Sequence, residues 1–141
     1  MASFVKFQAF VEHLAEKVHN LGSDTLKILL TNDAPSASAD AVKADLTSEL
    51  STGGGYTSGG SAVTITGSSQ TGGTYSLVGN DLVFTAASGT IGPFRYAVLY
   101  NDTPTSPADP LIGYWDYASS ITLADGETFT VDVGSSILTL A

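Results

Sequence analysis

Hydrophobic residues near the N-terminus recur every three or four positions, which is the spacing of one face of an α-helix. Ser3 is a suitable N-cap and Gly22 a suitable stop. The pattern predicts one amphipathic helix over residues 1–22, which either docks on its own domain or is presented to neighbouring subunits. Its apolar stripe consists of Phe4, Phe7, Val11, Leu14 and Val18.

The remaining residues, 23–141, contain short apolar or alternating segments separated by turn residues. Gly79-Asn80 and Asp125-Gly126 are typical of hairpin turns. Residues 94–100 are apolar on both faces apart from Arg95, so we place them centrally in a sheet. The strands expected are 25–30, 62–66, 75–78, 81–85, 94–100, 111–117, 121–123, 128–133 and 137–140.

This spacing of strands predicts a mainly β fold, an antiparallel β-sandwich of the jelly-roll-like kind, with one N-terminal amphipathic α-helix. Residues 38–46 are expected to form a second, short helical segment. Residues 51–61 hold five glycines around a lone aromatic side chain, Tyr56, and are expected to form a flexible loop. That loop is either a linker or an arm that presents Tyr56 to a partner.

Composition narrows the classes of function. Hydrophobic residues make up 43% of the 141 residues and charged residues only 13%, which favours a packed domain over disorder. Fourteen acidic residues against five basic ones give a formal net charge of −9. This balance argues against nucleic-acid binding and against a polybasic membrane anchor. The N-terminus lacks the pattern of a signal peptide, so we expect a protein made in the cytoplasm.

Residues that could carry chemistry are few. The chain has no cysteine, and its two histidines, His13 and His19, lie six positions apart, which places them on different faces of the expected helix and in solvent. No serine lies in a nucleophile elbow, and no glycine-rich phosphate loop follows a strand. Most carboxylates adjoin turn residues. We therefore expect no enzyme, cofactor or metal site, with a loop calcium site at Asp102 or Asp109 left open.

The strands at 94–100 and 111–117 carry one testable contact. If they pair antiparallel with Tyr100 opposite Leu111, Arg95 lies opposite Asp116, and the only arginine of the chain forms an ion pair or anchors an interface. The same strands carry most of the tyrosines and Trp115. These aromatic side chains are expected to fill the core, with one or two reaching the surface as protein contacts or as a carbohydrate platform.

Five motifs follow one another along nearly the whole chain in an order that resembles small virion structural proteins of tailed bacteriophages and prophages. They are GGGYTSGG (53–60), GGTYSL (72–77), IGPFRYAVLYNDT (91–103), LIGYWDY (111–117) and GETFTVDV…ILTLA (126–141), preceded by the N-terminal helix.

The resemblance implies a virion setting, in which small acidic β-sandwich proteins often decorate and cement the capsid exterior as trimers or dimers. The implied partners are the major capsid protein and further copies of this chain, with neither nucleic acid nor membrane. A tail-associated structural protein, or a carbohydrate- or receptor-binding module of the virion, is the alternative. The residues expected to form the interface are Phe4, Phe7, Val11, Tyr56, Arg95 and Trp115.

Overall fold

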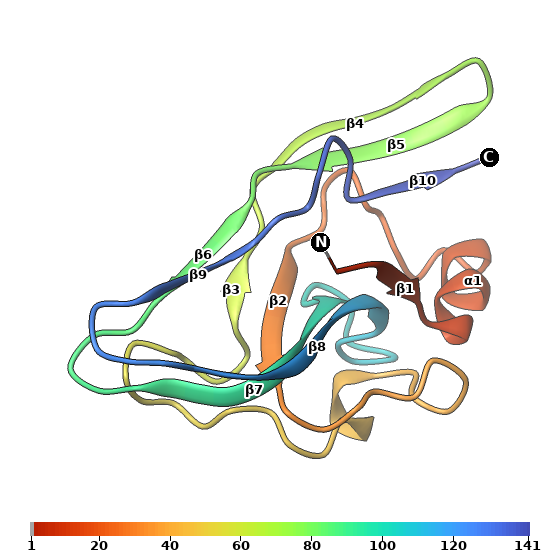
Figure 1. Ribbon diagram of the computed structural model, residues 1–141. Helices are drawn as coiled ribbons and strands as arrows, with labels where there is room; N and C mark the ends of the chain where they lie inside the picture. The colour runs from red at the N-terminus through yellow and green to blue at the C-terminus, as the bar shows by residue number, and fades with distance from the viewer. Residues whose placement is uncertain (1) are drawn as a thin grey trace.

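The computed structural model describes residues 2–141 and is mainly antiparallel β-structure with one α-helix, as the sequence predicts (Figure 1). The helix, α1, spans Gln8–Ala15, and a 3-10 turn, η1, spans Lys43–Asp45. The strands are β1 (Phe4–Lys6), β2 (Leu26–Thr31), β3 (Ser61–Ala62), β4 (Ile65–Thr71), β5 (Thr74–Gly79), β6 (Leu82–Thr85), β7 (Ile91–Asn101), β8 (Leu111–Leu123), β9 (Thr128–Val131) and β10 (Leu138–Leu140).

The strands form three sheets. The largest has the order β1-β8-β7-β2-β3, and the two smaller ones have the orders β10-β5-β4 and β6-β9. The smaller sheets follow one another along one side of the molecule, because β5 leads into β6 and β9 leads into β10 (Figure 1). This arrangement is compatible with the expected sandwich, whereas its jelly-roll character stays a prediction.

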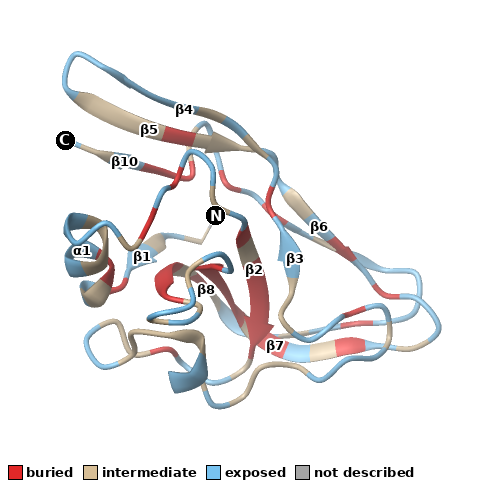
Figure 2. Cartoon of the chain, turned by 180° about the vertical axis from the view of Figure 1, so that it is seen from behind, coloured by how far each residue is buried: buried red, intermediate tan, exposed pale blue. Residues whose placement is uncertain are grey.

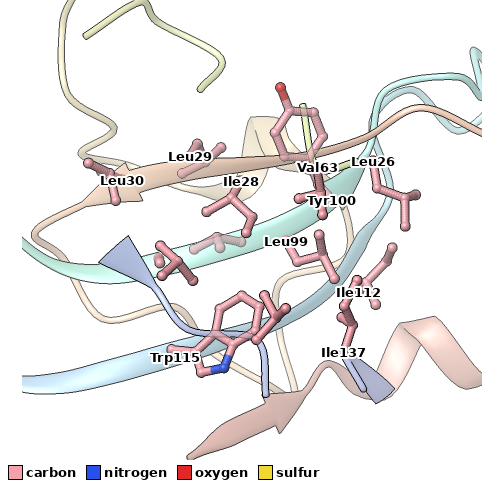
Figure 3. Close-up of a cluster of buried hydrophobic side chains, with 14 of the residues drawn as sticks. Leu26, Ile28, Leu29, Leu30, Val63, Leu99, Tyr100, Ile112, Trp115 and Ile137 are labelled. Carbon is pink, nitrogen blue, oxygen red and sulfur yellow. The ribbon is translucent and has the colours of Figure 1, made fainter. Parts of the chain in front are cut away.

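The core lies around the centre of the five-stranded sheet, where β2, most of β7 and the first residues of β8 are buried (Figure 2). Strand β7 pairs with β8 on one side and with β2 on the other, which confirms its central position. Side chains of the smaller sheets and their connections complete the cluster. Figure 3 labels ten of the core residues: Leu26, Ile28, Leu29, Leu30, Val63, Leu99, Tyr100, Ile112, Trp115 and Ile137.

The prediction that residues 1–22 form one helix is wrong. Phe4–Lys6 form β1, which pairs with the outer edge of β8, and the helix begins only at Gln8. Backbone hydrogen bonding to an otherwise open sheet edge takes precedence here over helical periodicity, which is a weak determinant in a short segment. The Phe4 ring lies over Gly113, at a place where any Cβ on residue 113 would collide with it.

Other boundaries differ from the pattern. Residues 67–71, a glycine followed by four uncharged polar residues, continue β4 and form a hairpin with β5 that turns at Gly72-Gly73. The expected strand at 121–123 is the end of the long strand β8. Within 38–46 only η1 is helical, because the Asp45 carboxylate accepts the backbone N–H groups of Ala41 and Val42 and holds the chain in a turn.

The glycine-rich segment 51–61 is packed against the body of the protein. Tyr56 is only 2% exposed, accepts a hydrogen bond from Leu30 N at 3.1 Å and donates one to Glu49 at 2.9 Å. Gly60 lies so close to the backbone of β2 that a Cβ there would overlap the Ile28 carbonyl. Gly60 therefore allows the glycine-rich segment to approach the backbone of β2 closely. The expectation of a flexible loop that presents Tyr56 to a partner is wrong, because Tyr56 is buried.

Candidate functional site

The expected interface residues separate into buried and accessible groups. Phe7, Tyr56 and Trp115 are buried in the core, so they are not surface contacts in this fold. Phe4 is half-buried, with its ring centroid 4.9 Å from that of Trp115. Val11 is 51% exposed because Phe10, one position earlier, is the member of the helix that enters the core. The side chain of Arg95, the remaining candidate, is 37% exposed.

Arg95 forms the expected pair with Asp116. Its Nε and Nη2 donate to the two carboxylate oxygens at 2.8 and 3.0 Å. Tyr100 pairs with Leu111 as expected, but an irregularity after that pair places Tyr96, not Arg95, opposite Asp116. The Arg95 hydrogen bonds, followed by the Ala118 N–H, lower the pKa of Asp116. Because both side chains are more than a third exposed, solvent screens this ion pair.

Replacing Arg95 by alanine should lower the melting temperature only slightly, because screened surface pairs contribute little to stability. Thermal unfolding of Arg95→Ala, Asp116→Ala and the double variant, followed by circular dichroism, measures the coupling between the two side chains. Unchanged stability together with lost self-association or capsid binding would assign Arg95 to an interface. A large loss of stability in Arg95→Ala alone would contradict the screened-pair interpretation.

The aromatic residues of β7 and β8 do not form an exposed platform. Tyr96, Tyr100 and Trp115 are buried, and the Tyr100 hydroxyl donates to the Gly59 carbonyl. Tyr114 packs against Phe7, and Tyr117 packs against Phe129 in an edge-to-face geometry. The possibility of a carbohydrate platform built around Trp115 is therefore removed by burial.

The two histidines are not solvated as expected. His19 is 7% exposed, His13 is half-buried, and their ring centroids lie 6.2 Å apart. The helix ends at Ala15 and Lys17 adopts a φ of 67°, so the chain turns back and helical spacing no longer relates positions 13 and 19. Burial, and then the neighbouring His13, lower the pKa of His19 to about 4, against a smaller opposing effect of Asp24.

Polar residues that the sequence interpretation passed over hold His19 in place. The Asn101 amide at the end of β7 donates to His19 Nδ1 at 3.0 Å and to the Asp24 carboxylate at 2.7 Å. Asn101 is fully buried, and it is the only polar residue in the otherwise apolar second half of a strand. A polar side chain at the end of a buried strand is the sequence signal that could have indicated this network.

The candidate calcium ligands are engaged in other ways. Asp102 forms an ion pair with Lys27 at 2.9 Å, and burial and nearby Asp102 raise the pKa of Asp109. Within residues 2–141, no group of three or more His, Cys, Asp or Glu side chains is placed to hold a metal ion. None of the helices in this same part of the chain has the length and apolar character needed to cross a bilayer.

The hairpin of β4 and β5 extends away from the five-stranded sheet, and most residues of β4 are exposed (Figure 1). Strand β4 is the outer strand of its sheet and is paired on one side only, with β5. The geometry therefore offers an extended polar edge at the hairpin and a histidine-containing network beside helix α1. Comparisons of the chain with models of protein families, with curated proteins and with solved structures found no match.

Proposed function

We propose that this chain is a non-enzymatic structural protein of a phage virion that decorates the capsid exterior as a cement protein. Its partners are the major capsid protein and further copies of itself, in a homotrimer or homodimer. The observation that carries this proposal is the open edge of β4 on the extended β4–β5 hairpin. The order of sequence motifs that resembles virion structural proteins supports the same setting.

The open edge of β4 has features that are typical of a strand to which a partner strand binds. Four successive residues at its end, 68–71, are exposed and have small or uncharged polar side chains. Proteins that keep a sheet edge solvated usually protect it with lysine, proline or a bulge, because unpaired backbone groups attract other strands. Strand β4 carries neither lysine nor proline, and its single irregularity lies at its start, between Ile65 and Gly67. Addition of a partner strand to such an edge is a common mode of recognition.

The charge distribution indicates the sign of the partner surface. Three of the five basic side chains, Lys27, Lys43 and Arg95, are already paired with carboxylates of this chain. The excess of acidic side chains therefore sets the field around the protein. A basic patch on the capsid surface would complement it and would steer many copies to equivalent sites.

Immunogold labelling of purified virions with an antibody against this chain tests the location. Label spread over the head in many copies is the expected result. Label confined to the tail or its tip would contradict decoration and would favour the tail-associated alternative. Absence of label, with the chain also absent from the virion by mass spectrometry, would overturn the virion assignment as a whole.

Changing the open edge should weaken capsid binding without unfolding the protein. Ser69→Lys places a long cationic side chain on β4, whereas Thr128→Lys makes the same charge change at an exposed position of β9. We expect Ser69→Lys to bind poorly to capsids that lack this protein, and Thr128→Lys to bind almost normally. Co-sedimentation with such capsids measures both. Equal binding by the two variants would exclude β4 as the docking edge.

A further inference from the structure

Residues 50–80 carry no charge, although the chain as a whole is strongly acidic. All fourteen acidic and all five basic residues lie outside this segment, so the rest of the molecule carries the formal net charge of −9. Strands β4 and β5 lie within the segment, and their hairpin extends away from the five-stranded sheet (Figure 1). Two copies of an acidic protein repel each other, and the repulsion is smallest where the facing surfaces are uncharged. The hairpin therefore has the electrostatic character of a contact between identical chains.

Among the edge strands of the three sheets, β4 is best suited to pair with a copy of itself. It has seven residues, whereas the other edge strands within residues 2–141 have two to four. Strand β9 lies between Glu127 and Asp132, and β6 follows Asp81, so self-pairing of either strand would bring carboxylates together. Strand β4 has no charged side chain, and most of its residues are exposed (Figure 2). Length, charge and exposure therefore favour β4 over the other edges.

The backbone of β4 offers hydrogen-bonding groups at alternate residues. Thr71 and Thr74 form the pair that closes the two-residue turn of the hairpin, and such a closing pair is hydrogen-bonded. Because hydrogen-bonded and non-hydrogen-bonded pairs alternate along an antiparallel ladder, the N–H and C=O groups of Gln70 and Ser68 point away from β5. Neither residue forms a backbone hydrogen bond to a segment outside the hairpin within residues 2–141. These two residues can therefore exchange hydrogen bonds with an added strand.

We propose that β4 pairs with β4 of a second copy of this chain around a two-fold axis, so that one antiparallel sheet runs through both copies. In the register that we infer, Ser69 lies opposite Ser69 of the second copy, and Ser68 exchanges backbone hydrogen bonds with Gln70 on both sides of the axis. The pairing uses residues 67–71, which follow the irregularity at the start of β4. The polar side chains of this stretch are uncharged donors and acceptors, which can face identical side chains without repulsion.

This inference rests on the proposed function, because it assigns a partner to the same open edge. In the dimer the uncharged hairpins face each other, and the acidic side chains, which lie outside residues 50–80, stay available to a basic capsid surface. A dimer binds two capsid sites at once, so loss of self-pairing also weakens capsid binding. Experiments on the isolated chain test the dimer without a capsid. A monomeric chain that is still found on virions would overturn the dimer alone, whereas a dimer that is absent from virions would overturn decoration alone.

Sedimentation velocity of the isolated chain tests the self-pairing. We expect a dimer with a dissociation constant on the order of 10 µM, because one added strand pair is a small interface. Ser69→Lys brings two ammonium groups together and should raise this constant about tenfold or more, whereas Thr128→Lys makes the same charge change on β9 and should leave it near the parent value. A parent chain that is monomeric at about 1 mM, or that forms trimers, would contradict the proposal, because a two-fold contact closes at two copies. An unchanged constant in Ser69→Lys would place the contact on another surface.

Disulfide formation between introduced cysteines tests the register, since the chain has no cysteine of its own. Ser69 and its counterpart form a non-hydrogen-bonded pair with Cα atoms about 4.5 Å apart, which a disulfide can span. The two copies of Gln70 lie diagonally, about 7–8 Å apart, which is too far. Under mild oxidation Ser69→Cys should form covalent dimers on a non-reducing gel, and Gln70→Cys should stay mostly monomeric. Equal cross-linking of the two variants would exclude this register. Absence of cross-linking in Ser69→Cys, with its circular dichroism unchanged, would exclude self-pairing of β4.

Discussion

Replacing Gly60 by alanine should destabilise the protein by about 3 kcal/mol or more, the largest effect that we expect from a single methyl group. Gly60 has a φ of 78°, which is costly for any residue with a Cβ. Its Cβ would also overlap the Ile28 carbonyl and lie 2.8 Å from Leu29 Cα. Strand β2 cannot move aside, because it is hydrogen-bonded between β3 and β7. The loop would therefore have to lift away from the sheet.

Gly72→Ala is the matched control. Gly72 has a φ of 60°, but an added Cβ there would meet no atom within 4 Å. Gly72→Ala should lower the free energy of unfolding by about 1 kcal/mol, which is the cost of the positive φ alone. Urea unfolding followed by circular dichroism gives both free energies. Equal losses in the two variants would show that the backbone conformation alone, and not the contact with β2, sets the requirement for glycine at position 60.

Acidification should destabilise the protein well above the pH at which most carboxylates titrate. In the unfolded chain His19 has its ordinary pKa of 6.5, whereas in the folded chain the pKa is about 4. Between these pH values the unfolded chain binds a proton at His19 that the folded chain does not bind. The contribution of neutral His19 to the free energy of unfolding is therefore fully present above pH 6.5 and is lost as the pH is lowered. The expected loss is about 2 kcal/mol at pH 5 and about 3 kcal/mol at pH 4.

His19→Gln provides the control, because glutamine can still accept the Asn101 hydrogen bond and does not titrate. The difference in unfolding free energy between the parent and this variant should change between pH 7.5 and pH 5, as measured by urea unfolding at each pH. Carboxylates with lowered pKa values, Asp45 and Asp116, lose their contributions only at lower pH. A parent chain whose stability follows that of His19→Gln throughout this range would show that His19 is free to protonate in the fold.

The strands were predictable where both faces of a segment are apolar. Residues 94–100 meet this condition, and they form part of the central strand β7 as predicted. The hairpin turn predicted at Gly79-Asn80 is wrong, because β5 pairs with β4 and β10, whereas β6 pairs with β9 in a different sheet. The Arg95–Asp116 pair followed from the register alone and formed despite an irregularity that the sequence does not reveal. The long side chain of Arg95 can reach Asp116 across a displacement of one residue, so the ion pair forms although the predicted register is off by one.

The failures have one physical origin, which is contact between segments distant in the sequence. The helical spacing of Phe4 and Phe7 is genuine, but the edge of β8 accepts the first of these segments as a strand. Tyr56 lies among glycines, which suggests exposure, yet its hydroxyl reaches Leu30 and Glu49. The prediction that His19 lies in solvent assumes a helix that continues past it, whereas α1 ends at Ala15, four residues before His19. Apart from Glu49, these partners lie outside the window of about 11–18 residues over which hydrophobic periodicity is assessed.

The pairing of β1 with β8 also affects the order of events during synthesis. Phe4 leaves the ribosome long before its partner Trp115, which lies much later in the sequence. Strand β2 likewise stays without its partner β7 until that later strand has been synthesised. Contacts that join distant parts of a chain form slowly, because a long loop has to close before they contribute any stability. The nascent segment that holds β1 therefore stays without its native partner until β8 has emerged, and the five-stranded sheet cannot be completed before that point.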